Sequence, residues 1–187
     1  MKKSILERYS QTVDNEIIID IAASKVEDLF SDFDKHAPYR KKELDQDLAD
    51  YLINSASEIG KKKFVIQFRL TKSADDNLTS RVTTSVHNYF LYLIALEFRE
   101  LRRMARSSLI LLVIGIVILF LAVWVNQKIA DNVTVIGHVF AEGLTVAAWV
   151  SLWNGIANFL INWTPHHRQI KMYKKISKAK IIFSKTV

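Results

Sequence analysis

Two long apolar stretches stand out in the second half of the chain. Residues 107–127 contain no charged side chain and are bounded by Arg106 and Lys128. As a helix they would extend about 31 Å, which matches the hydrocarbon core of a bilayer. Residues 144–163 form a second uncharged stretch, which ends at Trp163. Aromatic residues of this kind favour the membrane interface. The pattern predicts a transmembrane hairpin over residues 107–165.

Shorter and more mixed patterns precede the first apolar stretch and predict a small α+β domain. Residues 15–21 are rich in β-branched side chains, and residues 63–70 alternate between apolar and polar positions, so both segments favour strands. Between them we expect a short helix at 24–30, capped by Ser24, and a longer helix at 42–59 that ends at Gly60.

The segments on either side of the hairpin extend this prediction. From Leu78 to Arg106 no residue breaks a helix, so one continuous helix is expected to run into the first apolar stretch. Residues 180–184 are a further strand candidate that could return to the sheet. The predicted fold is α+β: a strand–helix–strand cytosolic domain with a long connecting helix at 1–106, the hairpin at 107–165, and a basic cytosolic tail at 166–187.

The charge of the chain is concentrated at its C-terminal end. The 26 basic residues exceed the 19 acidic ones by seven, and seven basic residues with no acidic one follow Pro165. Four Arg precede the first apolar stretch, whereas Lys128 is the lone basic residue between the two stretches. Because positive residues favour the cytoplasmic side, both termini are expected there, with the protein in the inner membrane of a bacterium.

The basic tail has two candidate partners. Residues 14–58 hold twelve acidic against five basic residues, so the tail could pair with this acidic stretch. The alternative is anionic lipid, where each Lys or Arg near the surface contributes about 1 kcal/mol. We favour lipid headgroups for the residues nearest the hairpin, namely Arg168, Lys171, Lys174 and Lys175.

Small residues recur every four positions along the second apolar stretch. Gly143, Ala147, Ser151 and Gly155 would line one face of a helix and allow another helix to approach closely. This spacing predicts helix packing, either against the first stretch of the same chain or against another subunit.

Three amides follow a neighbouring face of the same predicted helix. Asn154, Asn158 and Asn162 are also spaced by four residues. Amides within a bilayer need hydrogen-bond partners, which hydrogen bonds between helices or the water of a pore would supply. Asn162 could instead lie at the interface, which would leave two amides to be satisfied.

His138 and Glu142 share one helical face at the start of the second stretch. Such a pair could relay protons or contribute to a metal site, but two ligands are too few to specify zinc. An ordinary ion pair or hydrogen bond is the simpler interpretation. His166 and His167 adjoin the basic tail, where they fit an interfacial position.

The composition excludes several kinds of chemistry. The chain has no Cys, which excludes disulfides, Cys-ligated zinc and thiol nucleophiles. No glycine-rich phosphate loop, nucleophile elbow or H-E-x-x-H zinc motif occurs, so no catalytic residue, cofactor or metal site is predicted. The first hundred residues have no basic groove with interleaved aromatics, which argues against nucleic acid.

Several segments carry a family resemblance. Residues 142–153 (EGLTVAAWVSLW), followed by Trp163-Thr164-Pro165 and a basic segment around Tyr173, resemble a group of uncharacterised bacterial proteins with two membrane spans. The N-terminal strand, the Leu44-Asp45 pair with Tyr51, and the Arg-rich segment before the first span are similar to that group as well. After Trp153 this chain has Asn154-Gly155-Ile156-Ala157, where the group carries Arg-Pro and an acid. The resemblance implies the architecture and no activity.

These patterns together favour a non-enzymatic membrane protein. We expect a self-associating sensor, adaptor or scaffold whose cytosolic domain binds a protein or ligand, with the lipid bilayer and further copies of the chain as partners. The alternative is an oligomeric pore or ion channel, which could serve as a membrane effector, with the Asn face lining water. A membrane enzyme that uses His138 and Glu142 is the third alternative.

Overall fold

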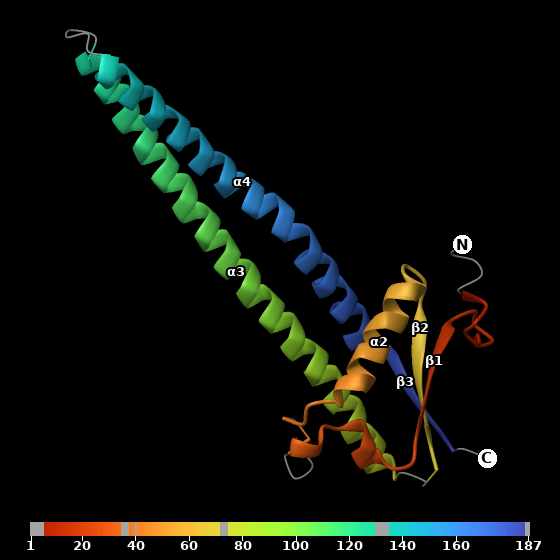
Figure 1. Cartoon of the computed structure of the whole chain (residues 1–187). Helices are drawn as coiled ribbons and strands as arrows, with labels where there is room; N and C mark the ends of the chain where they lie inside the picture. Colours follow the sequence, from red (N-terminus) through yellow and green to blue (C-terminus); the bar gives the residue numbers. More distant parts are fainter. Residues whose placement is uncertain (1–5, 35–37, 40, 72–74, 130–134, 186–187) are drawn as a thin grey trace. The chain divides into compact units, whose positions relative to one another are not determined.

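The computed structural model describes residues 6–34, 38–39, 41–71, 75–129 and 135–185. Its elements, in chain order, are β1 (Ile17–Ala23), the 3₁₀ turns η1 (Val26–Leu29) and η2 (Asp32–Asp34), α2 (Gln46–Ile59), β2 (Phe64–Leu70), α3 (Asp76–Ile129), α4 (Val135–Ser177) and β3 (Lys180–Lys185) (Figure 1). The chain divides into two compact units. The sheet unit comprises Met1–Leu96 and Gln169–Val187, and the hairpin unit comprises Glu97–Arg168.

The sheet unit contains three parallel strands in the order β1-β2-β3. Ile19 lies opposite Ile66 in one pair of strands, and Phe68 lies opposite Phe183 in the other. Parallel neighbours need a crossover connection. The segment containing α2 supplies the first crossover and the chain through α3 and α4 supplies the second. The two predicted strands are confirmed, and the C-terminal strand candidate does return to the sheet.

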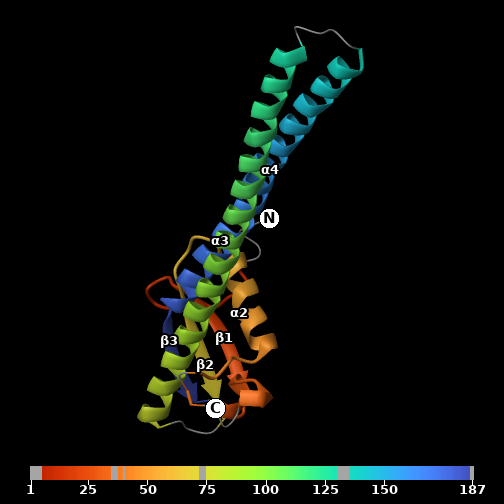
Figure 2. The same ribbon diagram turned by 90° about the vertical axis from the view of Figure 1, so that its left-hand side faces the viewer.

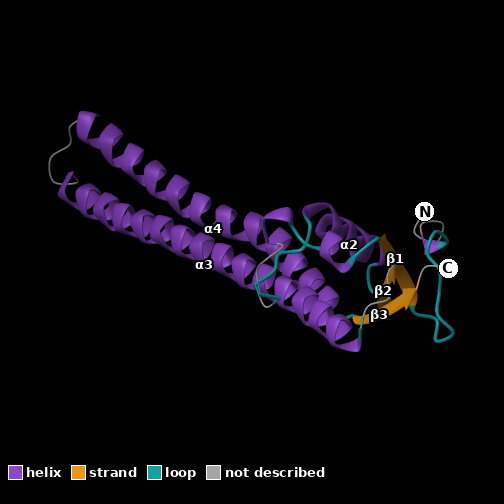
Figure 3. Cartoon of the chain, turned by 90° about the horizontal axis from the view of Figure 1, so that it is seen from below, coloured by secondary structure: helices purple, strands orange, loops and turns teal. Residues whose placement is uncertain are grey.

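The helices of the sheet unit cover one face of the sheet (Figure 3). Ile17, Ile19 and Phe68 point into this layer and are fully buried. Leu52 of α2, together with Val82, Val86 and Phe90 of α3 and Ile176 of α4, supplies the opposing side chains. The other face is mixed: Arg69 forms an ion pair with Asp20 at 2.9 Å there, and Val65 on the same face is fully buried. The α+β class is therefore confirmed.

Capping residues set the helix boundaries in this part of the sheet unit. The carboxylate of Asp45 accepts hydrogen bonds from the amides of Asp47 and Leu48, so α2 begins at Gln46 instead of Lys42. Gly60 ends α2 with a φ of 66°, as its position predicted. The predicted short helix is present as the 3₁₀ helix η1, but its N-cap is Lys25 and not Ser24, and the carboxylate of Asp28 accepts the Lys25 amide hydrogen.

The two long helices extend beyond the apolar stretches. α3 runs without interruption from Asp76 to Ile129, which confirms the predicted continuous helix. α4 continues through Pro165 to Ser177, so most of the basic segment is helical. Pro165 has no amide hydrogen and removes one hydrogen bond from that helix without ending it. The segment predicted as a separate tail thus consists of the end of α4 and the strand β3.

The hairpin unit consists of antiparallel parts of α3 and α4, which lie side by side (Figures 1 and 2). Both helices are long and apolar enough to cross a membrane, with mean hydropathies of 3.1 and 1.5 over their most apolar windows. Only 17% and 11% of these windows are buried within the chain.

Candidate functional site

The contact between α3 and α4 in the hairpin unit is built from small residues. They are buried and repeat every seven residues on each helix: Ser108, Gly115 and Ala122 on α3, and Ala141, Ala148 and Gly155 on α4. A seven-residue repeat keeps one seam of a helix facing its neighbour. Small side chains on this seam allow the two backbones to approach closely.

Two glycines mark the closest approach of these helices. A Cβ atom added to Gly115 would lie 2.8 Å from Cγ of Leu152 and 3.0 Å from the Leu152 backbone nitrogen. A Cβ atom added to Gly155 would lie 2.9 Å from Cγ of Leu112. Each leucine therefore fills the space that the glycine opposite leaves open.

The large apolar side chains of the unit point away from this seam. Phe120 and Trp124 on α3 are 73% and 58% exposed, and Trp149 and Ile161 on α4 are 64% and 71% exposed. A helix pair built for water would bury such residues and expose polar ones. Here the small residues are inside and the large apolar residues are outside.

A short chain of hydrogen bonds crosses the seam. The side-chain amide of Asn158 donates to Oγ of Ser108 at 3.2 Å, and the amide of Asn162 donates to Oδ1 of Asn158 at 2.5 Å. Ser108 is 2% exposed. The seven-residue repeat places Ser108 on the seam, and the four-residue spacing of the two asparagines stacks them on one side of α4.

An acid–base pair lies one helical turn further along α4. Nδ1 of His166 and Oε2 of Glu97 are 2.5 Å apart, and both side chains are largely buried. The adjacent His167 stacks on the ring of Trp163 with ring centroids 6.2 Å apart. Ser108, Asn158, Asn162, Glu97 and His166 thus form a polar track between the two helices.

No family model, curated protein or solved structure matches this chain. The geometry of the two units therefore carries the functional argument.

The predicted row of small residues divides between two environments. Gly155 packs against Leu112 of the same chain, and the hydroxyl of Ser151 donates to the carbonyl of Ala147 within α4. Ala147 is exposed, and a Cβ atom added to Gly143 would meet nothing within 4 Å. Intramolecular packing thus uses a different row, and packing of Gly143 and Ala147 against another subunit stays a prediction.

The predicted amide face also divides. Asn158 and Asn162 are hydrogen-bonded within the hairpin, as the interhelical alternative expected. Asn154 is exposed and makes no hydrogen bond to the described part of the chain. The prediction that this face lines a pore consequently rests on Asn154.

His138 and Glu142 are both exposed on α4, and no ion pair or hydrogen bond joins them. Among the described residues, no three His, Asp or Glu side chains are grouped closely enough to hold a metal ion. The buried acid–base pair of the hairpin is instead Glu97 with His166. Sequence reasoning missed it because the partners are far apart in sequence, although both lie near the same ends of the two apolar stretches.

The predicted lipid-binding residues differ in their surroundings. Nζ of Lys175 donates to the carbonyl oxygen of Gly60 at 2.8 Å and to that of Lys62, and lies 4.7 Å from the centroid of the Phe64 ring. Burial lowers the pKa of Lys175. Its ammonium group therefore stabilises the end of α2. Arg168, Lys171 and Lys174 are exposed, and their contact with lipid headgroups stays a prediction.

Proposed function

We propose that this chain is a non-enzymatic, self-associating membrane protein in which the sheet unit is a cytosolic binding domain. It would act as a sensor, adaptor or scaffold at the inner membrane. The observation that carries the proposal is the hairpin seam, which buries Gly115 and Gly155 while large apolar residues such as Phe120 and Trp149 face outwards. Lipid, unlike water, solvates such a surface without cost.

The sheet supports the proposed topology independently of the charge pattern. β3 follows the hairpin in sequence and pairs with β2, which precedes it. Both ends of the hairpin must therefore lie on the same side of the membrane. The basic residues that flank the hairpin favour the cytosol as that side.

Self-association is supported by the outer side of α4. Asn154 lies in the middle of the second apolar stretch, and its exposed amide would face lipid in a single copy. An amide in hydrocarbon gains from a partner, and the open positions at Gly143 and Ala147 would let a second helix come close.

Substituted-cysteine labelling tests membrane insertion and topology. Because the chain has no Cys, Ser57→Cys in α2 and Lys128→Cys at the closed end of the hairpin each give one thiol. In intact cells whose outer membrane is permeable, a membrane-impermeant maleimide should label Lys128→Cys, and Ser57→Cys only after lysis. A chain in the soluble fraction, or labelling of Ser57→Cys in intact cells, would overturn the proposal.

Native mass spectrometry in nanodiscs tests self-association. The wild-type chain should give an oligomer, and Gly143→Leu should reduce its subunit number because Gly143 has open space only within the single chain. Val146→Leu enlarges an exposed residue outside the row of small residues and should leave the oligomer intact. A wild-type monomer would overturn self-association, and a ring of four or more copies would favour the pore alternative.

A further inference from the structure

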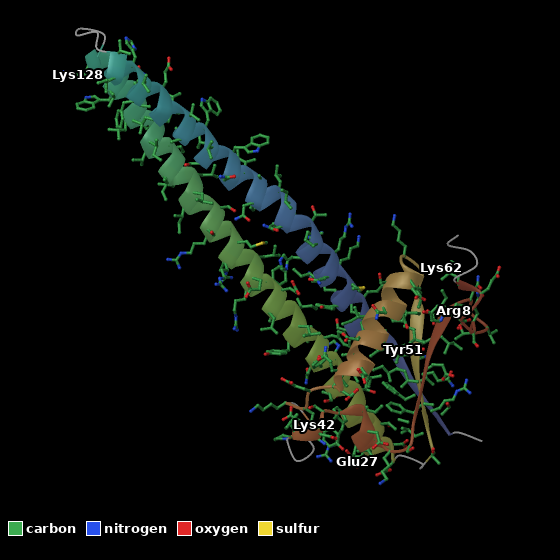
Figure 4. All side chains as sticks on the ribbon, in the orientation of Figure 1. Arg8, Glu27, Lys42, Tyr51, Lys62 and Lys128 are labelled. Carbon is green, nitrogen blue, oxygen red and sulfur yellow. The ribbon has the colours of Figure 1, made fainter. Side chains whose placement is uncertain are left out.

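Lys42 occupies an unusual position in the sheet unit. It lies just before α2 (Figure 4) and is 7% exposed. Among the described residues, it is the one Lys, Arg, Asp or Glu that is buried. Its Nζ atom lies 5.0 Å from the centroid of the Phe30 ring and 4.6 Å from that of the Tyr39 ring.

The ammonium group of Lys42 has aromatic partners but, within the part of the chain that the structure describes, no oxygen partner. The two rings attract its charge, yet an ammonium group carries three N–H donors that prefer oxygen acceptors. Within the described part of the chain, no carboxylate lies within ion-pair distance of Nζ and no oxygen accepts a hydrogen bond from it. Its N–H donors are therefore open to an acceptor other than the described oxygens, which can be water or a ligand.

Lys42 is one of the residues that line a cavity of about 240 Å³. Its lining residues come from the segment before α2 and from α3: Lys41, Lys42, Glu43, Asn88, Tyr89 and Tyr92. No fully enclosed side-chain nitrogen among the described residues lacks a partner, so Nζ of Lys42 keeps some contact with solvent.

The charges and donors of the lining indicate the kind of ligand. Lys41 and Lys42 together exceed the single charge of Glu43 by one positive charge. Asn88 and the two tyrosines add neutral hydrogen-bond donors, and burial raises the pKa of Tyr89 further above its ordinary value. One negative charge with two oxygen acceptors would neutralise the site and bond to Lys42.

We propose that this cavity binds a small carboxylate, with Lys42 as the buried donor and Lys41 and Asn88 beside it. The proposal names a ligand class for the sheet unit and to that extent rests on the proposed function. Carboxylate binding at this cavity requires neither membrane insertion nor self-association. A failure of carboxylate binding is thus distinguishable from a failure of either of those.

Isothermal titration of the full chain in nanodiscs at constant ionic strength tests the site, with acetate as the probe. Acetate should bind saturably, and Lys42→Met should weaken binding at least about tenfold, since it keeps the length of the side chain and removes the charge. Lys41→Ala alters an exposed residue, leaves the core intact, and should weaken binding by a smaller factor. Lys61→Ala is the matched control, an exposed lysine outside the cavity that should leave binding unchanged.

Three results would overturn the proposal. The first is the absence of saturable acetate binding. The second is acetate binding that Lys41→Ala and Lys42→Met leave unchanged, which would place the acetate elsewhere. The third is tighter binding of inorganic phosphate than of acetate in a parallel titration, which would exclude a carboxylate as the preferred class. If Lys42→Met does not fold, Lys41→Ala against Lys61→Ala decides the question.

Discussion

Replacing Gly115 with alanine should separate the two helices of the hairpin. The new Cβ atom would lie 2.8 Å from Cγ of Leu152, where carbon atoms prefer about 3.5 to 4.0 Å. Rotation of the Leu152 side chain cannot relieve the clash fully, because the Leu152 backbone nitrogen lies 3.0 Å from the same position. The backbones must therefore move apart.

The loss of stability caused by Gly115→Ala can be judged from this short distance and from a matched substitution. Overpacking a close contact costs about 1 to 3 kcal/mol. A helical Gly→Ala change also gains up to about 1 kcal/mol of helix propensity, which would mask part of that cost. Gly143→Ala receives the same gain and meets nothing within 4 Å. We expect Gly115→Ala to be less stable than Gly143→Ala by about 2 kcal/mol, the middle of the overpacking range.

Tryptophan fluorescence can follow this unfolding in mixed micelles titrated with SDS, with detergent in excess so that the chains are monomeric. The four Trp of the chain, at 124, 149, 153 and 163, all lie in the hairpin unit. Adding Leu152→Ala to Gly115→Ala should recover part of the loss, because it removes the Cγ and Cδ2 atoms that clash. Equal stabilities of Gly115→Ala and Gly143→Ala would refute the close approach of the helices at Gly115.

Three further predictions concern other contacts. Asn158→Leu leaves the buried hydroxyl of Ser108 without its donor and should destabilise the hairpin by about 1 to 2 kcal/mol in the same fluorescence assay. The double variant Ser108→Ala with Asn158→Leu should lose less free energy of unfolding than Asn158→Leu alone. Lys175→Met removes the donor to the carbonyl of Gly60 and should lower the free energy of unfolding of the sheet unit by about 1 kcal/mol, measured by hydrogen exchange of α2. The control Lys178→Met changes an exposed lysine and should leave this free energy unchanged. Burial and then the charge of Glu43 raise the pKa of Tyr89 above its ordinary value of 10.0. The contribution of protonated Tyr89 to stability is therefore complete below pH 10 and is lost as the pH rises through the higher pKa of the folded state. The loss of stability at alkaline pH should be less steep in Tyr89→Phe, measured by alkaline unfolding.

The elements of this chain could be predicted where local pattern decides structure. The alternation of Phe64, Ile66 and Phe68 predicts β2, and Gly60 predicts the end of α2 because few other residues adopt a positive φ. The uninterrupted run after Leu78 predicts α3. The start of α2 was misplaced, because the apolar repeat begins at Leu44 whereas the carboxylate of Asp45 fixes the first turn.

The contacts across the hairpin were harder to predict, because they depend on the register of two distant segments. The four-residue spacing of Gly143, Ala147 and Ser151 is conspicuous in the sequence, yet the structure buries the seven-residue row that includes Ala148 and Gly155. A second row of small residues on α3, from Ser108 to Ala122 at the same spacing, was the available signal. The burial of Lys42 had no such signal, since it depends on the rings of Phe30 and Tyr39.

The pairing of β3 with β2 has a consequence for the biogenesis of this protein. Phe183 reaches its place beside Phe68 only after both long helices have been synthesised, so one edge of β2 stays unpaired throughout that time. The three-stranded sheet can therefore be completed only after the whole hairpin has been synthesised. A chain that stalls or is truncated within α4 would retain the open β2 edge, and such an edge readily pairs with other strands. Quality control of the nascent chain could thus recognise incomplete copies from the sheet unit alone.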